Sequence, residues 1–525
     1  MWLLPLVIAC GGAPPQPPAA EPPAAARHTT GAPCESCHGE AHAAWAASTH
    51  ARAQGKTIDL GRFDGAPVVL PGLTATPARG SDGARFVVRD AAGDHTWPVV
   101  RTIGVHPLQQ YVLEGDAGRW LVAPIAWDVA KGAWFDPAPD GAVGDPADAM
   151  YWAGMAGNWN HQCATCHTTG AVKAFDPATG AYGGTSAVHD GVGCVACHGA
   201  KGDWTPRTTA QQLDTCGGCH SRRRPLTCGD EPPSASYLDR WRPATVESGA
   251  WGPDLRIADV VEPFEWASFA SSRMAAAGVT CTSCHDAHTG ALSRPGDATC
   301  TGCHSVAALS THVSQTDCVS CHMPTATYMG VHARHDHGFA RPGDTRHAGV
   351  LAAGLAGQAS SAAGLLALGL QPDASVFERA SAIALLRRVP PPADAVRLRG
   401  AAADRDPLVR AEAVATLGAW GDAATAAAAL EDPVRAVRFA AIEAFVTAGG
   451  DAARVRSAFD AVLAEVERLG ACDDDVPSTH LSLGRLRAAV GDRDGSIAAF
   501  EAALRLSPGD ATATRALQAL RSVAP

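Results

Sequence analysis

The stretch Cys281-Thr282-Ser283-Cys284-His285 places two cysteines three positions apart, with a histidine directly after the second. The same arrangement begins again 19 residues later as Cys300-Thr301-Gly302-Cys303-His304, and 18 residues after that as Cys318-Val319-Ser320-Cys321-His322. Four earlier segments follow it too, starting at Cys34, Cys163, Cys194 and Cys216. Seven copies of one five-residue pattern therefore dominate the first two thirds of the 525-residue chain.

Two thiols at this spacing can add to the two vinyl groups of one haem, and the adjacent histidine then ligates the iron. We therefore predict seven covalently bound haem c groups with their iron. The predicted attachment residues are Cys34, Cys37, Cys163, Cys166, Cys194, Cys197, Cys216, Cys219, Cys281, Cys284, Cys300, Cys303, Cys318 and Cys321. The predicted proximal ligands are His38, His167, His198, His220, His285, His304 and His322. Zinc is the main alternative, but it does not explain a histidine after every second cysteine.

The rest of the composition excludes several classes of protein. The formal charge is −11, from 42 Lys and Arg against 53 Asp and Glu, and no basic stripe appears. This balance argues against a nucleic-acid partner. No apolar run approaches the roughly 18 residues that a membrane-spanning helix requires. The 17 cysteines are too many for a reducing compartment unless a metal centre holds them.

The N-terminus has the features of an export signal. Residues 1–10, MWLLPLVIAC, are a short apolar run ending in a lipobox-like Cys10, the predicted lipidation site. Residues 11–33 are rich in Pro and Ala and predict an extended tether. We expect an exported lipoprotein of a Gram-negative bacterium, periplasmic or at the cell surface, that meets the membrane only through its lipid. No Lys or Arg precedes the apolar run, so an uncleaved or wrongly assigned start is the alternative.

Three further regions follow the tether. Residues 34–342 predict a heptahaem cytochrome c body of mostly short α-helices and irregular loops around haems. Within it, β-branched and aromatic runs at about residues 68–128 predict a small inserted antiparallel β subdomain. Beyond Ala348 the apolar residues take helical spacing and predict an all-α solenoid. Its residues 348–456 resemble HEAT repeats, with Asp-Pro turns at Asp406 and Asp432, and residues 457–525 resemble tetratricopeptide helices.

Several segments outside the seven motifs carry a family resemblance. They include Gly104-Val105-His106-Pro107, Asn158-Trp159-Asn160, Gly278-Val279-Thr280, Met323-Pro324 and Asp336-His337. In these segments the body is similar to multihaem c-type cytochromes related to the tetrahaem electron-transfer cytochrome of ammonia oxidisers. The similar branch of that family carries C-terminal HEAT and tetratricopeptide repeats. Relatives often have a further haem motif after the Asp-His segment, whereas here the chain continues directly into the solenoid.

The sixth iron ligands are harder to assign than the proximal ones. The resemblance favours His50, His288, His312 and His337 as distal ligands. Because His288 follows His285 by only three residues, we expect it to reach the iron of a neighbouring haem. A second group is as well explained by ordinary histidines as by distal ligands, and it comprises His42, His106, His161, His189 and His332.

Electron transfer is the favoured function: single electrons would pass along the haems, and the solenoid would dock redox partner proteins. A reductase or oxidase of small nitrogen or sulfur compounds, with one open iron position, is the enzymatic alternative. No motif replaces its histidine by lysine, a substitution typical of pentahaem nitrite reductases, and this favours the carrier. A haem-containing docking or sensor protein that acts through its repeats is the third reading. Cys228 and Cys472 are either ordinary side chains or bonded to each other in a disulfide. The run Arg222-Arg223-Arg224 either pairs with haem propionates or is a run of solvated charges.

Overall fold

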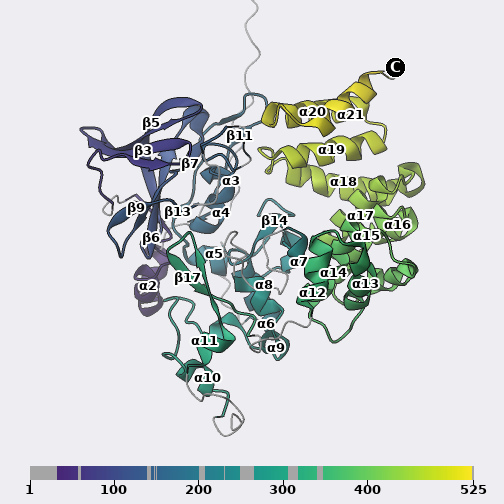
Figure 1. Ribbon diagram of the computed structural model, residues 1–525, viewed down its shortest axis with the longest axis horizontal. Helices are drawn as coiled ribbons and strands as arrows, with labels where there is room; N and C mark the ends of the chain where they lie inside the picture. Colours follow the sequence, from purple (N-terminus) through teal and green to yellow (C-terminus); the bar gives the residue numbers. More distant parts are fainter. Residues whose placement is uncertain are drawn as a thin grey trace, which may run out of the picture.

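The computed structural model describes residues 32–56, 61–138, 144–146, 148, 150–199, 207–229, 231–248, 265–305, 317–339 and 347–522. A β-rich N-terminal part and a helical C-terminal part lie on opposite sides of a region of short helices and loops (Figure 1). Within the described residues, no helix is long and apolar enough to cross a membrane. Residues 1–10, Cys10 among them, most of the tether at 11–33, and His312 lie outside this description.

Nine of the described strands form one antiparallel sheet in the order β2-β3-β4-β5-β6-β8-β9, with β1 paired to β5 and β7 to β6. Their bounds are Gln54–Gly55 (β1), Val68–Leu70 (β2), Leu73–Gly80 (β3), Gly83–Asp90 (β4), Gly93–Ile103 (β5), Leu108–Glu114 (β6), Trp120–Val122 (β7), Ala126–Asp128 (β8) and Ala133–Phe135 (β9). Alternate residues of β4 are buried, as in a strand with one solvated face. The long strands lie in the interval where the sequence predicts a β subdomain, and the sheet continues to Phe135.

The motif region contains only short elements. Its helices are Ala32–Glu35 (α1), Gly39–Ala46 (α2), Trp159–Gln162 (α3), Ala164–His167 (α4), Cys194–His198 (α5), Thr209–Gly217 (α6), Tyr237–Arg240 (α7), Glu265–Ala270 (α8), Arg273–Ala276 (α9), Ala298–Thr301 (α10) and Cys318–His322 (α11). Four two-stranded ladders connect them: Thr168–Thr169 with His189–Asp190 (β10, β13), Phe175–Asp176 with Ala181–Tyr182 (β11, β12), Arg223–Pro225 with Trp241–Pro243 (β14, β15), and Thr325–Tyr328 with His332–His335 (β16, β17).

The C-terminal part consists of helices packed in sequence order (Figure 1). Their bounds are Ala348–Leu355 (α12), Ala362–Gly369 (α13), Val376–Leu385 (α14), Pro407–Ala419 (α15), Ala423–Ala429 (α16), Arg435–Thr447 (α17), Arg456–Gly470 (α18), Pro477–Ala489 (α19), Arg493–Leu506 (α20) and Ala511–Ser522 (α21). Asp406 caps α15 by accepting a hydrogen bond from the Leu408 amide, and Pro407 occupies the first turn, where its missing N–H costs nothing.

One apolar core crosses from the motif region into these helices. Tyr237, Val246 and Trp266 are buried in the same cluster as Leu365 and Ile383 of the C-terminal helices. A disulfide joins Cys228 to Cys472, so the two cysteines outside the motifs are bonded to each other. The motif region and the C-terminal helices therefore share both packing and a covalent link.

Candidate haem-attachment region

The seven motifs fold alike at the backbone. In five of them the amide of the motif histidine donates to the carbonyl of the first cysteine, at 2.8 to 3.0 Å, and the other two lie inside the helices α5 and α11. Residues three and four positions apart then share one face of a helical turn. Both thiols and the imidazole of each motif are thereby presented on one side, which is the geometry that haem attachment requires.

Thiols of different motifs lie against each other. Cys34 lies close to Cys194, Cys166 to Cys219, Cys216 to Cys281, and Cys300 to Cys318. The Cys197 thiol also lies near Cys216, and the Cys284 thiol near Cys300. The motifs are thus connected in the order first, third, fourth, fifth, sixth and seventh, with the second joined to the fourth. Burial raises the pKa of the Cys163 thiol to about 12, which reflects how little water reaches this region.

Among the described residues, three pairs of imidazole rings from different segments lie close together in the motif region. The ring centres of His50 and His220 are 6.1 Å apart. Those of His198 and His288 are 6.4 Å apart, with ring planes only 19° from parallel, and those of His285 and His337 are also 6.4 Å apart. An atom bonded to both rings requires centres roughly 6 Å apart, because a metal–imidazole bond is about 2 Å long. Each pair joins one predicted proximal ligand to one predicted distal ligand, and His288 faces a neighbouring motif rather than its own.

Two of these predicted distal rings are in surroundings that favour the neutral form. Burial, followed by the charge of His220, lowers the pKa of His50, and burial lowers the pKa of His337. A neutral imidazole has the free nitrogen lone pair that a metal needs. On the opposite ring, the Glu265 carboxylate, 3.8 Å from Nδ1, raises the pKa of His220.

The second group of predicted distal histidines has other neighbours. His42 and His189 both lie against Trp45, with ring centres 5.3 and 5.7 Å from the indole. The Nδ1 of His332 accepts a hydrogen bond from Arg334, and burial lowers the pKa of this ring. His106 directly precedes Pro107 at the start of β6, in electrostatic range of His332.

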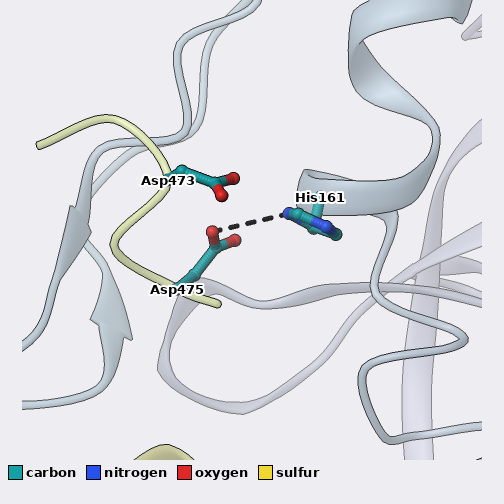
Figure 2. A group of neighbouring side chains, drawn as sticks. All are labelled: His161, Asp473 and Asp475. Atoms are coloured by element: carbon teal, nitrogen blue, oxygen red, sulfur yellow. Dashed lines mark ion pairs between the residues drawn. The ribbon is translucent and has the colours of Figure 1, made fainter. Parts of the chain in front are cut away.

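His161, the last of that group, points toward the C-terminal helices. Its Nδ1 lies 3.5 Å from Asp475, and Asp473 lies on the same loop between α18 and α19 (Figure 2). These three side chains could hold a metal ion. However, the Nζ of Lys173 is 2.5 Å from Asp475 and 3.7 Å from Asp473, so a cation of the chain itself already occupies the centre of the group. We therefore interpret the group as an ion-pair cluster that joins the two parts of the molecule.

Several buried nitrogens in the region have no hydrogen-bond partner among the residues that the structure describes. They are Nδ1 of His189, Nε of Arg223, Nε of Arg240 and Nε1 of Trp241. Buried donors in proteins are almost always paired, so these indicate a partner outside the chain. Haem, with two propionates and a large apolar surface, supplies acceptors of this kind. The residues present therefore fit the group that the motifs predict.

Residues 274–309 match the family model described as a doubled CXXCH motif. The matched segment contains the fifth and sixth motifs. The match supports a multihaem c-type cytochrome, and this motif implies covalently bound haem c with its iron. No curated protein and no solved structure matches the chain.

Some residues of the region gave no signal in the sequence. Glu265 belongs to no motif, and it lies 45 residues from the His220 that it contacts. The run Asp473-Asp474-Asp475 is visible as a cluster of acids, but its partner Lys173 lies 302 residues before Asp475. Only a family alignment could reveal pairings between such distant positions.

Proposed function

We propose that this chain is a heptahaem c-type cytochrome that transfers single electrons between redox partner proteins. The three facing imidazole pairs carry this proposal, since two histidines per iron produce the closed, low-potential coordination of an electron carrier rather than an open substrate site. In this proposal His50 is the distal ligand of the haem at the fourth motif, His288 of the haem at the third, and His337 of the haem at the fifth.

The contacts between thiols support a continuous path for electrons. Neighbouring attachment edges meet from the first motif to the seventh, and the second motif branches from the fourth. Electron tunnelling requires short edge-to-edge distances, which thiol contacts of this kind would provide. The branch at the fourth motif gives the path three ends, at the first, second and seventh motifs.

The remaining parts of the proposal concern location and docking. The chain would be exported and held by a lipid on Cys10, because haem c is attached outside the cytoplasm. The C-terminal helices would form HEAT-like and tetratricopeptide-like repeats whose faces, where not covered by the motif region, dock the redox partners.

Electron paramagnetic resonance of the oxidised, full-length protein tests the function. We expect mainly low-spin ferric signals, with at least three from irons that carry two histidines. A strong high-spin signal that shifts on addition of nitrite, hydroxylamine or sulfite would instead favour a reductase or oxidase with an open iron position.

A further inference from the structure

Two charged side chains of opposite sign lie at the junction between the second and fourth motifs. Arg223 donates from Nη2 to the Sγ of Cys166, a sulfur of the second motif, at 3.6 Å. Glu265 lies 3.8 Å from the Nδ1 of His220, the predicted proximal ligand of the fourth motif. The two motifs are themselves in contact through Cys166 and Cys219.

The positive charge of Arg223 is not neutralised by any acid in the described part of the chain. Its guanidinium stacks on Trp241, with the central carbon 3.9 Å from the ring centre, and its buried Nε has no partner. Arg240 is only 7% exposed. Its guanidinium lies beside Gly218, as does the Nε1 of Trp241. Asp214 and Glu231 act electrostatically on Arg240, and Glu231 is itself paired with Arg435 at 2.7 Å.

Glu265 acts on the fourth motif in the opposite direction. A carboxylate beside the distant nitrogen of an iron-bound imidazole makes that imidazole a stronger donor and favours the ferric state. Arg334 and His220 both lie 3.8 Å from this carboxylate, and its charge also reaches His337, the predicted distal ligand of the fifth motif.

We propose that Arg223 raises the reduction potential at the second motif and Glu265 lowers it at the fourth, so that electrons pass from the fourth motif to the second. This inference rests on the proposed function. In the step, one electron leaves the ferrous iron held by His220 and reaches the ferric iron held by His167, and no bond forms or breaks. A buried cation stabilises the additional negative charge of the reduced state, and a carboxylate on the axial histidine stabilises the oxidised one. The second motif is then the electron-accepting end of the branch.

Potentiometric titration of the haem-loaded, full-length protein, followed by optical and paramagnetic resonance spectra, tests this assignment. Arg223→Gln should move one midpoint potential downward by about 59 mV, a tenfold change in that reduction equilibrium. Glu265→Gln should move a different midpoint upward. Arg223→Lys keeps the charge and should largely restore the value. Arg224→Gln and Glu114→Gln alter exposed charges and serve as controls.

The possible results distinguish a failure of this inference from a failure of the proposed function. Equal shifts in Arg223→Gln and Arg223→Lys, or shifts no larger than in the controls, would overturn the inference while the haem content stays normal. If Arg223→Gln fails to load haem, Glu265→Gln still tests the junction from the fourth motif: one midpoint should rise by more than in the controls, and the absence of such a rise would overturn the inference. A wild-type protein without haem would overturn the proposed function as well.

Discussion

In the proposed function, the side chain of His288 would complete the coordination site of the third motif. Asp286 fixes the local turn by accepting from the His288 and Thr289 amides, at 3.1 and 2.7 Å. This turn directs the imidazole away from His285 and toward His198 of the third motif. The direction follows from the three-residue spacing, whereas the identity of the partner requires the tertiary structure.

Replacing His288 by Ala should open one iron position at the third motif. We expect one low-spin signal to be lost and one high-spin signal to appear in the paramagnetic resonance spectrum, with the other signals unchanged. His95→Ala, in strand β5 and stacked on Trp97, is the control. A spectrum of His288→Ala identical to wild type would show that His288 is not a ligand.

Glu412 links the motif region to the C-terminal helices. It is 1% exposed and accepts from Arg242 at 2.7 Å and from Arg387 at 2.9 Å. Glu412→Gln would remove the counter-charge of Arg242 and leave Arg387 with Glu247 alone, which should lower the free energy of unfolding by about 2 to 4 kcal/mol. Denaturant unfolding measures this loss, and Glu467→Gln, whose carboxylate is largely exposed, should change stability by about 0.5 kcal/mol or less.

The loop between α18 and α19 contacts distant parts of the chain. Asp475 accepts from Lys173 and from the hydroxyl of Tyr182, and Cys472 forms the disulfide a few residues earlier. The ion pairs of this loop act only while its acids are ionised, whereas the disulfide does not depend on their charge. This gives the contact a defined dependence on pH.

Burial alone would raise the pKa of Asp475. His161 and Lys173 nevertheless hold this pKa well below its usual range. An acid with a lowered pKa in the folded state contributes stability above its unfolded value, and this contribution is lost as the pH falls through the folded value. The difference in unfolding free energy between wild type and Asp475→Asn should therefore be constant above about pH 5 and shrink below about pH 4. A difference that grows as the pH falls would contradict the ion-pair cluster.

Much at the level of elements could be predicted from the sequence. The alternation in residues such as Phe86 and Val88 marks strand β4, and the Asp406-Pro407 pair marks the start of α15. The structure also forms a bond between Cys228 and Cys472, which the sequence left open. Glu265 and Asp475 could not be predicted, because each gains its partner only when segments far apart in the chain meet.

In the molecule as a whole, the change of composition near Ala348 does not separate two cores. Trp266 of α8 packs edge-on against Phe377 of α14, with ring centres 6.0 Å apart, inside one apolar cluster. Removal of residues 348–525 would therefore expose Tyr237, Val246 and Trp266 to water, at a cost of about 2 kcal/mol for each large side chain.

We expect the truncated chain, residues 1–347, to aggregate or to bind haem incompletely. Haem content per chain and size-exclusion profile measure both effects. Removing only α21, which lies at the far end of the helical row, is the matched control (Figure 1). A truncated chain that is monomeric and fully loaded would show that the motif region folds without the shared core.

The number of haems per polypeptide tests the account most directly. The pyridine haemochrome assay on purified, exported protein of known concentration should give seven haems per chain, with iron in the same ratio. A colourless protein, one with zinc in place of iron, or one with two haems or fewer would contradict the assignment of the seven motifs.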